Sequence, residues 1–92
     1  MSQKYIIRTE RAGVFFASIA DRRGSECDLL NARRIHYFNG ATECIGISQS
    51  GVGTGSRLTV TIPSMTVLGV IEVLPCTAAA QKTLEEWPEW TV

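Results

Sequence analysis

The chain has 92 residues, of which 45% are apolar, and nine basic side chains balance nine acidic ones, so that its net charge is zero. This length fits a single domain over residues 1–92, and this apolar content excludes a disordered chain. The zero net charge argues against nucleic-acid binding, because proteins of that class are usually basic overall, and no run of about 18 apolar residues predicts a membrane span.

The first part of the chain predicts an antiparallel sheet. Residues 4–9 and 13–20 are rich in β-branched and aromatic side chains, and a third, shorter strand is expected at 26–30. Turn signals separate these segments. A fourth strand is expected to follow at once, in the stretch NARRIHYFNG from Asn31 to Gly40.

The stretch 31–40 is the main candidate for a binding surface. Side chains alternate across a strand. One face would carry Arg33, Ile35 and Tyr37, and the other Arg34, His36 and Phe38. Both faces then hold a cation beside apolar or aromatic residues, which suits a sheet edge, an interface or the wall of a pocket.

The residue types in this stretch indicate what it would bind. Arginine binds carboxylate or phosphate through two parallel hydrogen bonds. We expect Arg33 and Arg34 to lie outside the apolar core and to contact such a group, while His36, Tyr37 and Phe38 stack or pack beside it. In the structural alternative, the two arginines clamp acidic residues of the same fold. The candidates for such a clamp are Glu26, Asp28 and Glu72.

The middle of the chain predicts a short helix and a glycine-rich loop. The helix would begin at Thr42 or Glu43 and end at Gly51. The loop SQSGVGTGS then follows a helix, whereas a phosphate-binding loop follows a strand and opens a helix, so a plain mobile loop is expected. A ligand lid is the alternative. Its residues would be Gly51, Gly53, Gly55 and Arg57.

Two apolar segments after the loop predict further strands. RLTVTI alternates regularly, so Leu58, Val60 and Ile62 are expected to face the core. MTVLGVIEVL, residues 65–74, is almost entirely apolar and is expected to form one central strand that is covered on both faces.

A C-terminal helix is expected to cover that strand. Thr77 would cap the start of the helix and Pro88 would end it. Its buried stripe would consist of Ala80, Leu84 and Trp87. Trp90 would either fold back onto the domain or be kept for a partner. The expected fold class is α+β, a mostly antiparallel sheet of about five to six strands with one short helix and a C-terminal helix packed on it.

The sequence offers little catalytic chemistry. His36 is the only histidine, and the G-x-S-x-G motif of serine hydrolases is absent, so we expect no enzymatic activity. Cys27, Cys44 and Cys76 lack the paired spacing of metal ligands. We therefore expect three free thiols, no metal and no cofactor.

Five pieces of the chain form a recognisable series. They are IIRT at 6–9, AGVFF at 12–16, NARRI at 31–35, VIEVLPCT at 70–77 and EEWPEW at 85–90. From Tyr5 to Trp90 the chain thereby resembles a family of small phage and prophage proteins that is known only as a domain of unknown function. It departs from that family at His36 and Phe38, where tryptophan is expected, and in its glycine-rich loop.

The resemblance implies a phage or prophage origin and a place in the cytoplasm of the bacterial host, and residues 1–10 indeed lack the apolar segment of a signal peptide. Small phage proteins without enzymatic motifs often act by binding. We expect an accessory protein that engages a host protein or an anionic, nucleotide-like small molecule, with counter-defence as its role. The alternative is an assembly protein whose aromatic and arginine-bearing strand is a subunit interface. A homo-oligomer is expected, because a chain this short has a small core.

Overall fold

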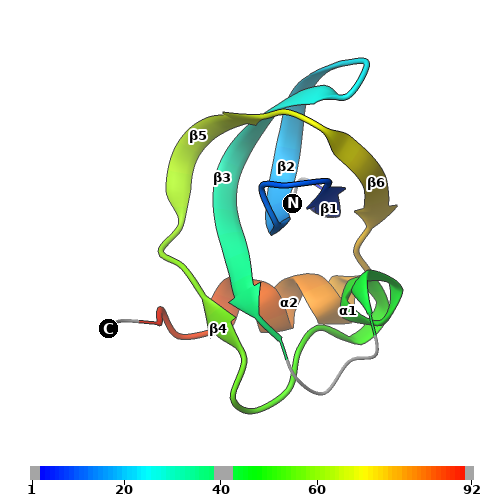
Figure 1. Cartoon of the computed structure of the whole chain (residues 1–92). Coiled ribbons are helices and arrows are strands. Elements are labelled where there is room, and N and C mark those ends of the chain that lie inside the picture. The colour runs from blue at the N-terminus through cyan, green and yellow to red at the C-terminus, as the bar shows by residue number, and fades with distance from the viewer. Residues whose placement is uncertain (1–2, 39–42, 91–92) are drawn as a thin grey trace.

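The chain forms six strands and two helices in a computed structural model that describes residues 3–38 and 43–90 (Figure 1). The elements are β1 (Tyr5–Thr9), β2 (Val14–Arg23), β3 (Glu26–Tyr37), α1 (Cys44–Ser50), β4 (Arg57–Leu58), β5 (Ile62–Val67), β6 (Val70–Pro75) and α2 (Ala78–Glu86). All strand pairs of the sheet are antiparallel. The expected α+β fold class, with one short helix and one C-terminal helix, is confirmed.

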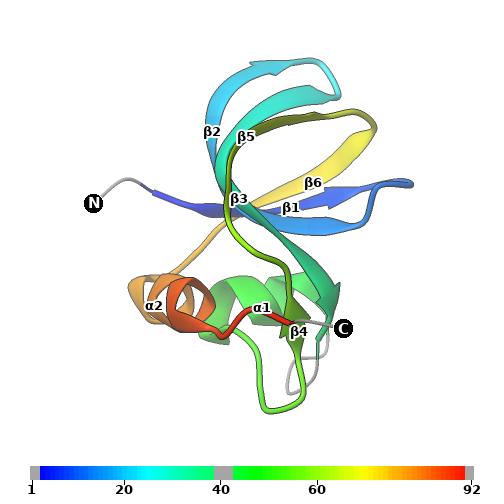
Figure 2. The same ribbon diagram turned by 90° about the vertical axis from the view of Figure 1, so that its left-hand side faces the viewer.

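The sheet is a curled meander. β1, β2 and β3 pair in sequence, β6 returns to the free edge of β1, and β4 and β5 pair with different parts of β3. β5 and β6 arch over the first three strands, and the two helices lie together on the other side of the sheet (Figures 1 and 2). Register shifts in the β2–β3 pair bend the strands, as β-bulges do.

Each face of the sheet therefore has its own apolar core. Strand alternation directs Ile6, Phe16 and Ile35 toward the helices, where they pack with Ile47 and Leu84. It directs the intervening residues into the curl. These include Ile7, Phe15, Ala17, Leu29, Ala32, Val67 and Val70. The curl closed by β5 and β6 thus replaces a second layer of helices.

The C-terminal helix agrees with its sequence pattern. The hydroxyl of Thr77 accepts a hydrogen bond from the Ala80 N–H at 3.1 Å, so Thr77 caps α2. Ala80 and Leu84 are fully buried. Trp87 follows the last helical residue, and its indole N–H donates to the carbonyl of Ser56 at 2.9 Å. The expected cap is confirmed, as is the burial of Ala80 and Leu84, whereas Trp87 is only partly buried and lies just after the helix. α2 shares its core with residues of β1, β2 and β3, and Leu74 of β6 packs against that core.

Two strand predictions near the middle of the chain were wrong. The segment expected at 26–30 and residues 31–37 of the next expected segment form one strand, β3, whose Asn31 has a positive φ of 51°. The expected strand 57–62 is broken. Ile35 pairs with Leu58 and Ala32 with Ile62, so three steps along β3 face four steps along the other segment. This extra residue places Leu58 in the helix-side core and leaves Val60 and Ile62 exposed by 51% and 37%.

The apolar segment 65–74 is two strands rather than one. Gly69, at φ +74°, turns the chain between β5 and β6, and its carbonyl accepts the Glu10 N–H at 2.8 Å. The turn residue Leu68 is 66% exposed, and Ile71 on β6 is 56% exposed. The expected single strand with cover on both faces is therefore not formed. β5 buries side chains inside the curl, whereas on β6 Val73 packs into the curl and Leu74 packs against the helix-side core.

Candidate functional site

Arg33 is a core residue, which contradicts the expectation that it lies outside the apolar core. It is 3% exposed, its Nε donates to the Thr59 carbonyl at 2.8 Å, and its Nη1 donates to the Leu84 carbonyl at 2.7 Å. Burial lowers the pKa of Arg33, and the negative charge of Glu89 acts in the opposite direction. Since Leu84 lies in the last turn of α2, the guanidinium also meets the negative end of the helix dipole. Arg33 therefore joins β3, α2 and the segment after β4, and offers no surface to a partner.

Arg34 points to the other side of β3 and is exposed. Its guanidinium carbon lies 5.1 Å from the centre of the Phe15 ring, an arrangement that orients the cation. The β1–β2 turn lies beside it, since a Cβ at Gly13 would be 4.0 Å from Nε of Arg34, an ordinary contact distance. No carboxylate within the described residues lies at ion-pair distance from this guanidinium. Arg34 is thus a cation that Phe15 orients and that has no ion-pair partner within the described ranges 3–38 and 43–90.

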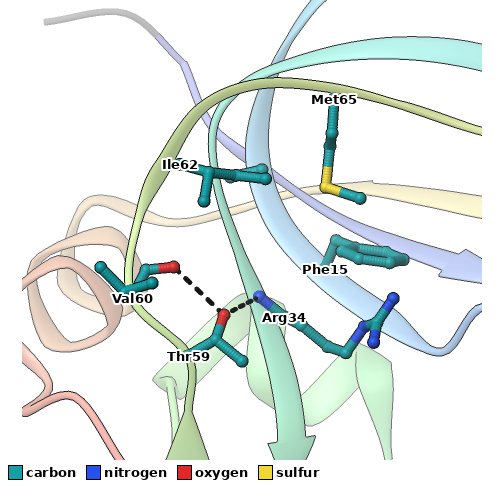
Figure 3. A pocket seen from close by; sticks show the side chains of 7 residues that line it. Phe15, Arg34, Thr59, Val60, Ile62 and Met65 are labelled. Carbon is teal, nitrogen blue, oxygen red and sulfur yellow. Dashed lines mark hydrogen bonds between the residues drawn. The ribbon is translucent and has the colours of Figure 1, made fainter.

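Two hollows adjoin at Arg34 and Met65, which line both of them, and we call the pair the Arg34 groove. The inner lobe, of about 250 Å³, is completed by Phe15, Ala32, Thr59, Val60 and Ile62 (Figure 3). The outer lobe, of about 480 Å³, is completed by residues 10–12 of the β1–β2 turn and 66–69 at the end of β5. The irregular segment 57–62 opens the inner lobe, because the extra residue between Leu58 and Ile62 turns Val60 and Ile62 toward it.

His36 and Tyr37 lie at the C-terminal end of β3 and do not line the Arg34 groove. The His36 ring stacks on Trp90 with centroids 4.9 Å apart and planes 8° apart. The Arg57 guanidinium lies over both Trp90, at 5.1 Å, and Tyr37, at 5.9 Å. We call these four residues the tail cluster. Of the two expectations for Trp90, the structure shows that it folds back onto the domain. Its backbone N–H also donates to the Leu58 carbonyl at 2.9 Å.

Phe38 is separated from both of these places. It packs against the helix-side core and lines a third hollow of about 320 Å³. The other residues of that hollow are Arg8, Val14, Glu43, Cys44 and Glu72. The five candidate site residues of this stretch therefore divide into one core residue, one groove residue, two members of the tail cluster and one residue of a third hollow, rather than one continuous site. Asn39 and Gly40 lie outside the described residues.

The four candidate lid residues also differ in setting. Gly51 is buried at the end of α1, Gly53 and Gly55 lie in the loop, and Arg57 belongs to β4. Ser56 holds the loop closed on itself through hydrogen bonds from its N–H and hydroxyl to the Gly53 carbonyl, at 3.2 and 2.7 Å. A lid function of this loop stays a prediction.

The internal clamp on acidic residues exists, but a different arginine forms it. Arg23, at the β2–β3 turn, pairs with Asp21, Glu26 and Asp28. Hydrogen bonds from Arg23 and from Thr66 lower the pKa of Asp28. Neither Arg33 nor Arg34 forms an ion pair with a carboxylate in the described part of the chain.

In the native protein at neutral pH, none of the three cysteine thiols should react rapidly with a thiol reagent. All three are buried, and burial raises their pKa values, that of Cys76 to about 12, so little reactive thiolate is present. Titration with a chromogenic disulfide before and after unfolding should detect all three thiols only after unfolding. Stoichiometric zinc in the purified protein would contradict the assignment of free thiols.

The comparison with family models identifies the family of this chain. Residues 2–84 match the family described as Domain of unknown function (DUF6948), and the chain belongs to this family. Neither the curated proteins nor the solved structures gave a match to this chain. None of the helices in the described ranges 3–38 and 43–90 is long and apolar enough to span a membrane. The resemblance to a domain of unknown function is therefore confirmed, while its phage origin stays a proposal.

Sequence reasoning missed most of the groove. The residues around Arg34 come from segments far apart in the chain, and no local pattern links them to it. They include Phe15, Gly13, Met65 and the turn at 10–12. Arg34 itself was found because arginines are concentrated in the stretch 31–40. The partner of His36 was unspecified because Trp90 lies after the last helix, where no periodicity fixes its position.

Proposed function

We propose that this chain is a non-enzymatic binding protein whose Arg34 groove receives the anionic part of a host factor or of a small molecule. The observation that carries the proposal is the Arg34 guanidinium, which is exposed, oriented by Phe15 and unpaired among the described residues, in the middle of a mostly apolar groove. A guanidinium in such a place forms charge-assisted hydrogen bonds with carboxylate or phosphate.

The side chains of the groove support binding rather than catalysis. Its described lining holds no histidine, serine or cysteine that would act as base or nucleophile. The only histidine, His36, is stacked on Trp90 in the tail cluster. The resemblance to phage and prophage proteins adds the proposal that the chain acts in the cytoplasm of a bacterial host, as an accessory protein in counter-defence.

Replacing Arg34 by glutamine should remove a ligand that co-purifies with the protein. Loss of one charge-assisted contact, roughly 1.5–3 kcal/mol, corresponds to an affinity loss of about tenfold to a hundredfold. Native mass spectrometry of protein purified from bacterial cells reports the retained mass directly. The control is Arg22→Gln, which removes an exposed arginine outside both lobes. Equal retained mass on wild type and both variants, or none on wild type, would contradict the proposal.

A subunit interface is the second candidate, and exposed apolar side chains favour it. Val60, Leu68 and Ile71 are each more than half exposed, and contact with a second copy would remove this apolar area from water. We expect light scattering at high concentration to give a mass above the 10.1 kDa of one chain. Ile71→Asp, outside the groove lining, should shift the mass toward one chain. A wild-type mass of one chain at the highest concentration would remove the interface.

A further inference from the structure

We infer that the ligand of the Arg34 groove is a small acid with a single negative charge and an apolar body, such as an aromatic or medium-chain carboxylic acid. The inference rests on the proposed function, since it uses the same guanidinium as the anion-binding group. It goes further in excluding the nucleotide-like ligands that the arginines by themselves would equally suit.

The inner lobe has almost no polar atoms to offer. Apart from Arg34, the only polar side chain among its described lining residues is that of Thr59. The Thr59 hydroxyl accepts a hydrogen bond from the backbone N–H of Arg34 at 2.8 Å and donates to the Val60 carbonyl at 3.2 Å (Figure 3). The Thr59 N–H and carbonyl are also engaged, with the Arg34 carbonyl and with Arg33. A nucleobase placed here would lose hydrogen bonds with water and gain none from these side chains, which is unfavourable. A hydrocarbon body meets no such cost.

The charges of the outer lobe indicate how many negative charges the ligand carries. Its lining contains Arg11 and Arg34 but also Glu10, so its charged side chains sum to one positive charge. The Thr66 hydroxyl is not available as an additional donor, because it donates to Asp28 at 2.7 Å. A monoanion balances this lobe, whereas a di- or triphosphate would bring excess negative charge close to Glu10 and Asp28.

The shape of the groove fits a ligand with an apolar body and a charged head group. An apolar cavity of about 150 Å³ is large enough to bind benzene. The inner lobe, at about 250 Å³, has room for a larger ring or a short chain lying between Ile62, Val60 and Met65. Figure 3 shows the Arg34 side chain running beneath Phe15 along one side of this space, so a carboxylate attached to the body would meet the guanidinium at the junction of the lobes.

A matched pair of fluorescent probes tests the inference. 8-Anilinonaphthalene-1-sulfonate carries an apolar ring system and one negative charge, and N-phenyl-1-naphthylamine is its neutral counterpart. In a fluorescence titration, Arg34→Gln should weaken binding of the sulfonate by about tenfold or more, and binding of the neutral probe by less than about twofold. Octanoate should displace the sulfonate from the wild type, and adenosine monophosphate and triphosphate should not.

Two further variants keep the result interpretable. Arg22→Gln should bind both probes as the wild type does. Val60→Asp, at a half-exposed position outside the strands, should weaken both probes because it places a charge in the wall of the inner lobe. Circular dichroism and a melting curve confirm that each variant is folded.

Each contrary outcome has a definite meaning. Sulfonate binding that is equal in the wild type and Arg34→Gln would overturn the inference, as would equal sensitivity of both probes to this substitution. Displacement by a nucleotide or by a glutamate-containing peptide, but not by octanoate, would also overturn it. In that case the proposed function would still hold if Arg34→Gln abolished this competitor's binding. If Arg34→Gln altered neither the probes nor the retained mass, both proposals would fail.

Discussion

Arg33→Ala should destabilise the domain by about 3 kcal/mol, and its melting temperature should fall by roughly 12–24 °C. The substitution leaves the carbonyls of Thr59 and Leu84 without the donors that they have at 2.8 and 2.7 Å. An unsatisfied buried polar group costs roughly 1–3 kcal/mol, and a cavity adds to this. The gain from removing a buried charge, whose Nη2 has no partner among the described residues, offsets only part of the loss.

Arg34→Ala is the matched control for this prediction. It removes the same side chain from the next position of β3, but there the guanidinium is exposed and its described contact is the ring of Phe15. We expect a stability change within about 0.5–1 kcal/mol, in the range of an exposed cation–π contact. Urea unfolding of both variants measures the difference. Arg33→Lys should also destabilise the domain. A lysine side chain is shorter and ends in a single ammonium, whereas the planar guanidinium of Arg33 donates to two carbonyls.

Equal stability of the two single variants would show that the contacts of Arg33 do not stabilise the fold. A loss confined to Arg33 would mean that a joint substitution of both arginines tests folding and binding at once. Such a joint variant would then not distinguish a loss of binding from a loss of folding. Arg34 alone separates the two effects.

The contrast between these neighbours shows what the stretch 31–40 could and could not reveal. Alternation correctly placed Arg33 and Ile35 on one face of the strand and Arg34 and His36 on the other. It could not say which face is covered, because the cover comes from α2 and from the segment after β4, far along the chain. A local pattern fixes relative orientation, whereas burial depends on tertiary partners.

The groove also shows that a local sequence pattern cannot predict every tertiary feature. Regular alternation in RLTVTI predicts one buried face, and a single extra residue between the Leu58 and Ile62 pairings moves these two side chains to opposite faces. The hydrogen bonds that Thr59 makes with Arg33 and Arg34 hold this bulge. Similarly, Gly69 is surrounded by apolar residues, so nothing nearby in the sequence indicated the turn that separates β5 from β6. The inner lobe exists because of the first irregularity, and the outer lobe is bounded by the second.

Gly51→Ala should destabilise the domain by about 3 kcal/mol, because two separate effects act at this position. The backbone there has φ 79° and ψ −150°, a region that is essentially restricted to glycine. In addition, a Cβ at Gly51 would lie 2.9 Å from both Cβ and Cγ2 of Thr83 on α2, closer than real Cβ contacts. The close approach of α1 to α2 therefore requires glycine, beyond its use in ending the helix.

Gly24→Ala gives a reference for the backbone cost of a positive φ without a close contact. Gly24 also has a positive φ, 61°, but a Cβ there would meet nothing within 4 Å, so only the backbone cost of roughly 1–2 kcal/mol is expected. Adding Thr83→Ala to Gly51→Ala removes two of the three close atoms and should recover part of the loss. Urea unfolding of the four proteins gives both differences.

The result also bears on the proposed lid. If Gly51→Ala costs clearly more than Gly24→Ala, the end of α1 is fixed against α2, and any movement of the glycine-rich loop must arise at Gly53 or Gly55. If the two substitutions cost the same, the contact with Thr83 has slack, and a movement of the loop could also begin at Gly51. The lid prediction would then gain a hinge at the helix end. In the former case it is limited to the loop that Ser56 closes through the Gly53 carbonyl.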